Sequence, residues 1–205
     1  MPSQKKYDQI LDALKHLLEN KDIKTISVNE IAQAAGIAKG SIYYYFPSKE
    51  AIMDALVERN YEKPMETAKN LAKQTNISPF TRMAMIFQAC RNTSVEFLRQ
   101  NAKAPENKMP DTLLLHQKYL NHLVTELKPV LTAIIEQGIE KGDIHFDRPA
   151  ALAEIVLIVL AVKSDTTLIP STQEEIEETI LGLISLLEKG TGNPAGSLNF
   201  LMTPP

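Results

Sequence analysis

The chain has 205 residues, of which 44% are hydrophobic and 23% charged, a composition typical of a globular protein long enough to bury a core. Its net charge of −3 and isoelectric point near 5.9 lack the basic excess of a protein that binds nucleic acid without sequence preference. The single cysteine, Cys90, excludes an intrachain disulfide and favours a reducing, cytoplasmic compartment. The longest apolar run, 150–162, is too short to span a membrane, and no signal-peptide pattern opens the chain.

Helical periodicity dominates the first part of the chain. Residues 6–19 place leucines and isoleucines at helical spacing, with charged residues between them. The capping-box pattern S-x-x-E at 27–30 begins a second helix, which must end at Gly36. A short third helix is expected from about Ala38 to just before Pro47, because proline disfavours helical geometry in the preceding residue.

The rest of the chain also has helical patterns and contains no convincing strand. Pro129 is expected to kink a long helix or to begin a new one. The Gly- and Pro-rich tail 191–205 is expected to be loosely ordered. The remaining helices are expected over 48–62, from Pro79 onward, and over 111–141, 149–163 and 172–188. The sequence therefore predicts an all-α fold.

A capped helix, a glycine-containing turn and a short second helix are the layout of a helix-turn-helix motif, here at about 27–46. In such motifs the second helix enters the major groove with its N-terminal residues near base edges. Lys39, Gly40 and Ser41 lie at that end. Because glycine destabilises a helix, its presence there suggests that the backbone must come close to another molecule.

The charge pattern of the motif also suits DNA. No acidic residue occurs from Ile31 to Lys49, so a locally positive face is expected on a nearly neutral domain. Lys49 and the backbone N–H groups that follow Ser48 suit a phosphate at the start of the fourth helix.

Three consecutive tyrosines, Tyr43, Tyr44 and Tyr45, point in directions spanning roughly 200° of a helix, so they cannot all face one core. Aromatic clusters are more often core than ligand contacts. With Ile42 and Phe46 as buried anchors, however, Tyr43 and Tyr44 project outward, where they can meet phosphate oxygens or a thymine methyl group. Tyr45 is expected to be partly packed beneath the motif.

The segment TISVNEIAQAAGIAKGSIYYYFPSKEAIMDALV, residues 25–57, resembles the N-terminal DNA-binding region of the TetR family of bacterial transcriptional regulators. The resemblance rests on the alanine before the turn glycine, the Gly-Ser step, the YYYF run and the Ser-Lys-Glu that begins the fourth helix. Helix order agrees along the rest of the chain, and EQGIEKGDI, residues 136–144, looks like the end of the family's seventh helix.

The resemblance implies an all-α homodimer of about nine helices that binds a palindromic operator through one helix-turn-helix per subunit. It implies a DNA-binding domain at 1–47 and an effector-binding and dimerisation domain at 48–190. A small effector bound among helices four to seven would change the separation of the two recognition helices. Asn29 departs from some members, which carry a base-reading arginine there. Carried over by position, the DNA contacts are Ser27, Asn29, Lys39, Gly40, Ser41, Tyr43, Tyr44, Tyr45 and Lys49.

The two apolar helices at 149–163 and 172–188 lack a polar stripe wide enough for the surface of a monomer. Paired with the same helices of a second subunit they would form a four-helix interface, although ordinary core is the alternative interpretation. The expected interface residues are Ile155, Ile158, Val159, Val162, Ile176, Ile180, Leu183, Ile184 and Leu187.

An effector pocket is expected where apolar side chains mix with a few polar groups, and each such residue can equally be plain core or surface. Cys90 is expected to be a small buried hydrophobe. His116 and His122 lie about 240° apart around a helix, which makes them poor partners for one metal, and no metal or other cofactor is expected. The pocket candidates are Met83, Phe87, Cys90, Arg91, Phe97, Met109, His116, Tyr119 and His122.

The sequence therefore predicts an effector-gated, DNA-binding transcriptional regulator, and the family's habit favours a repressor. One alternative is a helical ligand-binding or interaction protein whose motif no longer binds DNA specifically, which the acidic isoelectric point favours. The other is an all-α enzyme. It lacks support, because the sequence contains no HExxH, no Cys/His cluster and no Gly-rich phosphate loop.

Overall fold

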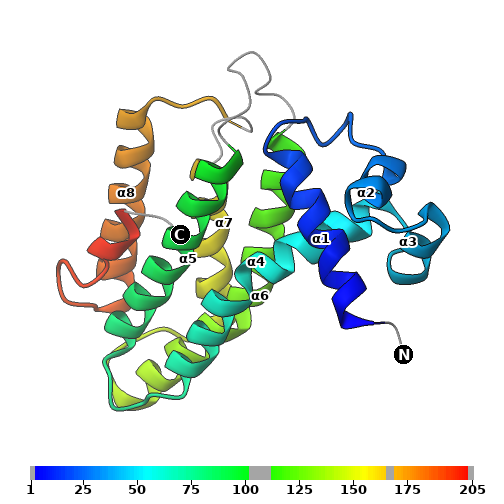
Figure 1. The fold of residues 1–205 in the computed structure, drawn as a ribbon. Coiled ribbons are helices and arrows are strands. Elements are labelled where there is room, and N and C mark those ends of the chain that lie inside the picture. The colour runs from blue at the N-terminus through cyan, green and yellow to red at the C-terminus, as the bar shows by residue number, and fades with distance from the viewer. Residues whose placement is uncertain (1–2, 102–111, 165–168, 203–205) are drawn as a thin grey trace. The chain divides into compact units, whose positions relative to one another are not determined.

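The computed structural model describes residues 3–101, 112–164 and 169–202 (Figure 1). These ranges contain eight α-helices, one short 3-10 helix and no strand, which confirms the all-α prediction. The chain divides into two compact units, and α4, α5 and α6 each contribute to both of them. The N-terminal unit comprises residues 1–62 and 95–122, and the C-terminal unit comprises 63–94 and 123–205.

The N-terminal unit contains the three helices expected for the motif, grouped together in Figure 1: α1 (Gln4–Leu18), α2 (Val28–Ala34) and α3 (Lys39–Tyr45). Each helix turns its apolar positions inward, and the ring of Tyr7 packs on that of Phe46 with 4.7 Å between centroids. The unit therefore has its own apolar core, as expected of a helix-turn-helix domain. The side chains in this core that are at most 4% exposed include Ile10, Leu11, Leu14, Ile26, Ile31, Ile42 and Phe46.

Helix α4 (Lys49–Ala72) is longer than the sequence indicated, because it continues through Pro64. A proline inside a helix costs about 3 kcal/mol through the lost N–H and the clash of its ring. Met65, Ala68 and Leu71 continue the apolar face beyond it and are at most 5% exposed. Since burying a Met or Leu side chain contributes roughly 1.5–3 kcal/mol, their packing outweighs the proline penalty.

The C-terminal unit is built mainly from α5 (Pro79–Asn101), α6 (Thr112–Lys141), α7 (Pro149–Ser164) and α8 (Gln173–Thr191), which contribute to it wholly or in part. Helix α6 runs through the exposed Pro129. No new helix therefore begins at this proline, which was one of the two outcomes expected from the sequence. Water can satisfy the carbonyl that a proline leaves unbonded when it lies on the exposed side of a helix. The segment 136–144 forms the end of α6 and the turn after it, in which Gly138 O accepts from the backbone N–H of Asp143 at 2.8 Å.

Residues 193–202, which we call the C-terminal cover, pack against the unit, in contrast to the loose tail expected from their composition. Leu198 and Leu201 are 5% and 2% exposed, and the ring of Phe200 lies edge-on to that of Phe87, with 5.4 Å between centroids. The Glu188 carboxylate Oε1 accepts from the backbone N–H groups of Gly196 at 2.8 Å and Leu198 at 3.3 Å. The glycines form turns here, with the 3-10 helix Asn199–Met202 after them.

A buried arginine connects three helices of the C-terminal unit. Arg82 is 0% exposed, and its Nη1 donates to the backbone oxygen of Ala72, at the end of α4, at 3.2 Å. The same nitrogen donates to Gln137 Oε1 on α6 at 2.5 Å. Burial lowers the pKa of the guanidinium. Nothing in the sequence pattern indicated this contact, because an arginine four residues into a helix usually faces solvent.

Two glycines of the motif allow a paired stability test. Gly36 has a φ of 67°, a left-handed conformation that costs other residues about 1–2 kcal/mol, so Gly36→Ala is expected to lower the free energy of unfolding by about that amount. Gly40 lies inside α3 with no atom within 4 Å of an added Cβ. Gly40→Ala is therefore expected to raise the free energy of unfolding by up to about 1 kcal/mol. Urea unfolding followed by circular dichroism measures both, and shifts of the same sign would contradict the assigned conformations.

Candidate nucleic-acid interface and ligand cavity

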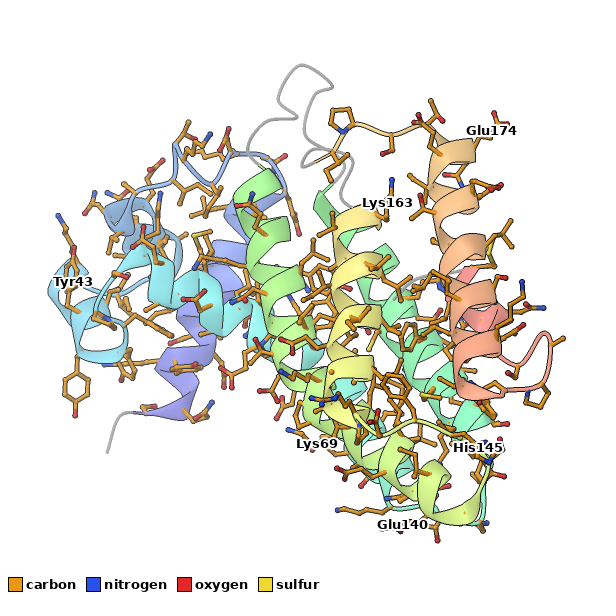
Figure 2. All side chains as sticks on the ribbon, turned by 180° about the vertical axis from the view of Figure 1, so that it is seen from behind. Tyr43, Lys69, Glu140, His145, Lys163 and Glu174 are labelled. Atoms are coloured by element: carbon orange, nitrogen blue, oxygen red, sulfur yellow. The ribbon has the colours of Figure 1, made fainter. Side chains whose placement is uncertain are left out.

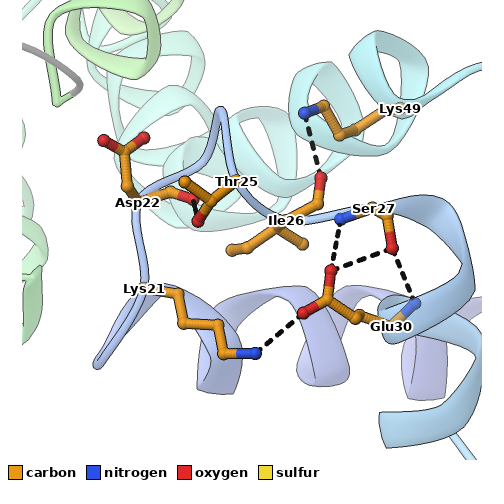
Figure 3. Close-up of polar contacts among 7 residues, drawn as sticks. All are labelled: Lys21, Asp22, Thr25, Ile26, Ser27, Glu30 and Lys49. Atoms are coloured by element: carbon orange, nitrogen blue, oxygen red, sulfur yellow. Dashed lines mark hydrogen bonds and ion pairs between the residues drawn. The ribbon is translucent and has the colours of Figure 1, made fainter.

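The first helix of the motif begins with the capping box that the sequence predicted (Figure 3). Ser27 Oγ accepts from the Glu30 N–H at 3.2 Å, and Glu30 Oε2 accepts from the Ser27 N–H at 2.8 Å. Lys21 Nζ donates to Glu30 Oε1 at 2.8 Å. This hydrogen bond from Lys21, followed by those from Ser27, lowers the pKa of Glu30 to about 2. The contacts fix where α2 starts and leave the side chains of Ser27 and Asn29 exposed.

Lys49 has partners that the sequence did not indicate. Its Nζ donates to the backbone oxygens of Ile23 at 2.8 Å and Ile26 at 3.0 Å, in the loop between α1 and α2, and Figure 3 shows the second of these contacts. The side chain therefore connects the start of α4 to the loop that precedes the motif. An ammonium group has three N–H donors, so any contact of Lys49 with DNA would use the third.

Helix α3 presents the tyrosines as expected. Tyr43 and Tyr44 are 51% and 68% exposed, and Figure 2 shows Tyr43 at the outer edge of the helix. Tyr45 is half-buried, and its hydroxyl accepts from the Ser3 N–H at 3.3 Å. The rings of Tyr44 and Tyr45 meet edge to face with 5.4 Å between centroids. Since Ile42 is buried, the exposure of the two outer rings follows from helix geometry.

The first turn of α3 is open to a large partner. Lys39 and Gly40 are exposed, Ser41 is half-buried, and the space beside the Gly40 Cα is empty. The acids that flank this acid-free stretch are both engaged. Glu30 pairs with Lys21. The Glu50 carboxylate accepts hydrogen bonds from the Glu50 backbone N–H and from the Ser48 hydroxyl, and these lower the pKa of Glu50. The surface around α3 therefore combines exposed cationic, aromatic and backbone groups, the combination that suits a phosphate backbone.

The C-terminal unit contains a cavity of about 40 Å³. Its walls are almost entirely apolar, and the two polar side chains among them are those of Thr191 and Asn193. The Thr191 hydroxyl donates to the backbone oxygen of Leu187 at 2.6 Å, whereas Asn193 Oδ1 is buried without a hydrogen-bond partner among the described residues. The residues lining the cavity are Phe80, Met83, Phe87, Leu131, Ile135, Ile144, Leu152, Ala153, Val156, Leu187, Thr191, Asn193, Leu198, Phe200 and Leu201.

Two of the residues that the sequence selected for an effector pocket, Met83 and Phe87, line this cavity. Cys90 and Arg91 follow on α5 but do not line it, and burial raises the pKa of the Cys90 thiol to about 12. Tyr119 and His122 belong to the other unit. The side chains of Phe97, Met109 and His116 lie outside the described part of the chain.

The environment of Tyr119 and His122 is aromatic. The ring of Tyr119 stacks on that of Tyr61 with 4.5 Å between centroids, and His122 lies 6.5 Å from the same Tyr61 ring. Sequence reasoning missed most of the cavity lining, because apolar wall residues such as Leu131 and Val156 have the same pattern as core residues.

Helices α7 and α8 expose large apolar side chains. Ile155 and Ile158 on α7 are 51% and 47% exposed, and Leu181 and Leu186 on α8 are 48% and 74% exposed. Ile180 and Ile184, which the sequence assigned to an interface between subunits, are 1% and 5% exposed and belong to the core of their own unit. The other expected interface residues, Val159, Val162, Ile176, Leu183 and Leu187, are half-buried.

The outward face of α8 is therefore about one residue, or roughly 100°, away from the stripe chosen from the sequence. Either stripe is apolar, so periodicity alone could not decide which one faces the core.

Within the described ranges, no group of three or more His, Cys, Asp or Glu side chains could hold a metal ion. None of the helices, over the same residues, is both long and apolar enough to cross a membrane.

Comparison with known proteins gives a consistent set of matches. Residues 10–56 match the family model for bacterial regulatory proteins, tetR family. Over 105 residues the chain is 33% identical to the HTH-type transcriptional regulator EthR of Mycobacterium tuberculosis, covering 42% of this chain and 49% of EthR. Over 199 residues it is 27% identical to the fatty acid metabolism regulator protein of Bacillus subtilis, covering 92% of this chain and 96% of that protein. The match thus spans about half the length of EthR and nearly all of the Bacillus protein.

Solved structures share the fold over almost the whole chain. RolR in complex with resorcinol has a TM-score of 0.62 at 17% identity, covering 98% of this chain and 94% of that one. SmeT, the repressor of the Stenotrophomonas maltophilia multidrug efflux pump SmeDEF, has a TM-score of 0.60 at 15% identity, covering 93% and 92%. The flavonoid-responsive regulator FrrA has a TM-score of 0.59 at 22% identity, covering 95% and 100%.

The lowered pKa of Glu30 predicts how the stability of the N-terminal unit depends on pH. Because folding favours the ionised carboxylate, its contribution is complete above the ordinary pKa of 4.5 and is lost as the pH falls toward about 2. Glu30→Gln is expected to lower the free energy of unfolding at neutral pH. The variant should also lose less of this free energy than the wild type as the pH falls from about 4.5 to about 2. Urea unfolding at several pH values measures this, with the exposed Glu62→Gln as control. If the free energy of unfolding of Glu30→Gln fell as steeply with decreasing pH as that of the wild type, the lowered pKa of Glu30 would be refuted.

Proposed function

Because this chain belongs to the TetR family of bacterial transcriptional regulators, we propose that it is a homodimeric repressor that binds a palindromic operator and is gated by a small effector. The observation that carries the DNA-binding part is the surface of α3, where Tyr43, Tyr44 and Lys39 are exposed on a helix anchored by the buried Ile42. Exposed aromatic rings cost free energy in water unless a partner covers them, and the cationic surroundings suit DNA as that partner.

The proposed DNA contacts divide by the part of the duplex they meet. Ser27 and Asn29, at the start of α2, suit phosphates, as the N-terminus of a bracing helix does. In α3, Lys39 and Tyr43 are proposed to reach base edges, with Gly40 allowing close approach of the backbone. The remaining proposed contacts are Ser41, Tyr44, Tyr45 and Lys49. Two of these side chains also have a positioning role, because Tyr45 accepts a hydrogen bond from Ser3 and Lys49 donates to two backbone oxygens.

The effector site is proposed to be the cavity in the C-terminal unit. Ligand sites are concave, mainly apolar and provided with few polar groups, and this cavity has that character. RolR is described in complex with resorcinol, SmeT in complex with triclosan, and FrrA as flavonoid-responsive. Proteins of this fold thus bind or respond to small, largely apolar compounds, which supports the same class of effector here. Helices α4, α5 and α6 contribute to both units and so provide a route by which the effector could act on the motif.

The homodimer is proposed to form through the exposed apolar residues of α7 and α8, namely Ile155, Ile158, Leu181 and Leu186. An exposed apolar surface of this kind typically marks a protein interface. Gly182 and Ser185 lie between the two leucines on the exposed side of α8, and such small residues allow a second helix to come close.

The DNA-binding proposal is tested on duplexes selected from a random-sequence pool by the purified protein. A palindromic consensus is expected, with affinity that falls steeply with salt. Lys39→Ala is expected to weaken binding and to relax the sequence preference at the base it contacts. Tyr43→Ala is expected to weaken binding about tenfold and to relax the sequence preference, since a lost base contact costs about 1–3 kcal/mol.

The control for this experiment is Lys69→Ala, which removes an exposed lysine that pairs with Glu126 within the C-terminal unit, and the affinity of this variant should equal that of the wild type. Weak binding without sequence preference would favour the ligand-binding or interaction protein that has lost specific DNA recognition. Unchanged affinity in both α3 variants would refute the contact assignment.

The dimer proposal is tested by light scattering after size-exclusion chromatography. The wild type is expected at twice the chain mass of 22.9 kDa, and the variant Ile155→Glu/Leu186→Glu at the mass of one chain, because the two carboxylates would be buried without partners. Met85→Glu changes a similarly exposed apolar residue on α5, 47% exposed, and should leave the dimer intact. A monomeric wild type, or a dimeric double variant, would reject this interface.

A further inference from the structure

We propose that the cavity of the C-terminal unit binds an uncharged, mainly apolar alcohol or phenol whose hydroxyl donates a hydrogen bond to Asn193 Oδ1. The inference rests on the proposed effector site and goes further by naming the chemical class of the ligand and the residue that anchors it. Three observations carry it: the chemistry of the walls, the unpaired oxygen and the origin of one wall in the C-terminal cover.

The walls exclude an ionic ligand. Among the described residues that line the cavity, none carries a charge, and all except Thr191 and Asn193 present only apolar side-chain atoms. Moving a carboxylate or an ammonium group from water into such surroundings without a counter-ion is strongly unfavourable. A neutral molecule that covers the aromatic rings of Phe80, Phe87 and Phe200 gains from the same walls.

One polar side chain that lines the cavity has an atom without a partner in the described part of the chain. Thr191 already donates its hydroxyl proton to the Leu187 carbonyl, inside its own helix. Asn193 Oδ1 is buried, and the described residues supply no donor for it. A buried acceptor without a donor destabilises the empty state, so a ligand that brings one O–H group satisfies both partners at once. The side chain therefore selects for a donor on the ligand.

The cavity has its present size because the C-terminal cover fills part of the space. About 40 Å³ holds only a few water-sized groups, whereas a one-ring ligand needs more. Leu198, Phe200 and Leu201 of the cover form one wall. Glu188 accepts three hydrogen bonds from backbone N–H groups of the cover: its carboxylate accepts from Gly196 and Leu198, and its backbone oxygen accepts from Asn193 at 3.1 Å. A ligand is expected to displace these apolar side chains and to take their place against α5, while Asn193, next to the end of α8, stays where it is.

The test compares three probes of similar size on the full chain: 4-ethylphenol, 4-ethylanisole and 4-ethylbenzoate. They carry a donor, no donor and a charge, respectively. Calorimetric titration is expected to give 4-ethylphenol about fivefold tighter binding than 4-ethylanisole, the worth of one net hydrogen bond, and no binding of 4-ethylbenzoate. Asn193→Leu, which keeps a similar side-chain volume, is expected to remove the preference for the phenol. Ser197→Ala is the control, because Ser197 Oγ is also buried and unpartnered but does not line the cavity.

Failure to bind 4-ethylphenol, equal affinity for phenol and anisole in the wild type, or an unchanged preference in Asn193→Leu would each overturn the proposal. The comparison of probes on the wild type stands even if a variant fails to fold. Operator retention, measured on the same wild-type preparation, separates this inference from the proposed function. A protein that binds the operator but none of the probes refutes only the ligand class, and one that binds the phenol but no operator refutes only the regulator.

Discussion

The position of α3 depends on how the chain is held just before α2. The Lys49 ammonium donates to two carbonyls of the loop between α1 and α2, and the Ser27–Glu30 capping box, reinforced by Lys21, fixes the first turn of α2. Gly36, with its positive φ, then sets the direction in which α3 starts. The exposed tyrosines therefore lie on a helix whose entry is determined by a few polar contacts, and two of the residues that make them, Ser27 and Lys49, are also proposed to meet DNA.

The C-terminal unit is organised by apolar packing, and its few buried polar atoms stand out for that reason. Arg82 joins the ends of three helices through Ala72 and Gln137, so its role is structural. Asn193 Oδ1 lacks such a partner and lies at the cavity. Arg82 Nε and Nη2 are also buried without partners among the described residues, but Arg82 does not line the cavity, so Asn193 is distinguished both by its unpaired oxygen and by its place in the cavity lining.

Much of the fold, and the exposure of the residues proposed to contact DNA, could be predicted from the sequence, because local signals specify them. The capping box, the turn glycine and the spacing of Ile42 and Phe46 act within a few residues and carry their own geometry. The partners of Lys49 could not be predicted, since they lie 23 and 26 residues away in the chain.

Predictions were less successful where several apolar choices have the same pattern. Helix α8 is apolar enough that either Ile180 or Leu181 could face outward, and only packing against the rest of the unit decides it. The cavity and the ordered C-terminal cover could not be predicted for a related reason. Both depend on contacts between segments distant in the sequence, and such contacts leave no periodic pattern.

The C-terminal cover also affects the order in which the protein matures during synthesis. The motif is encoded in the first part of the chain, and its helices make their mutual contacts within a short stretch of sequence. One wall of the cavity, in contrast, consists of Leu198, Phe200 and Leu201, which leave the ribosome after every α-helix of the described chain. A nascent chain can therefore form the motif well before it can form the cavity.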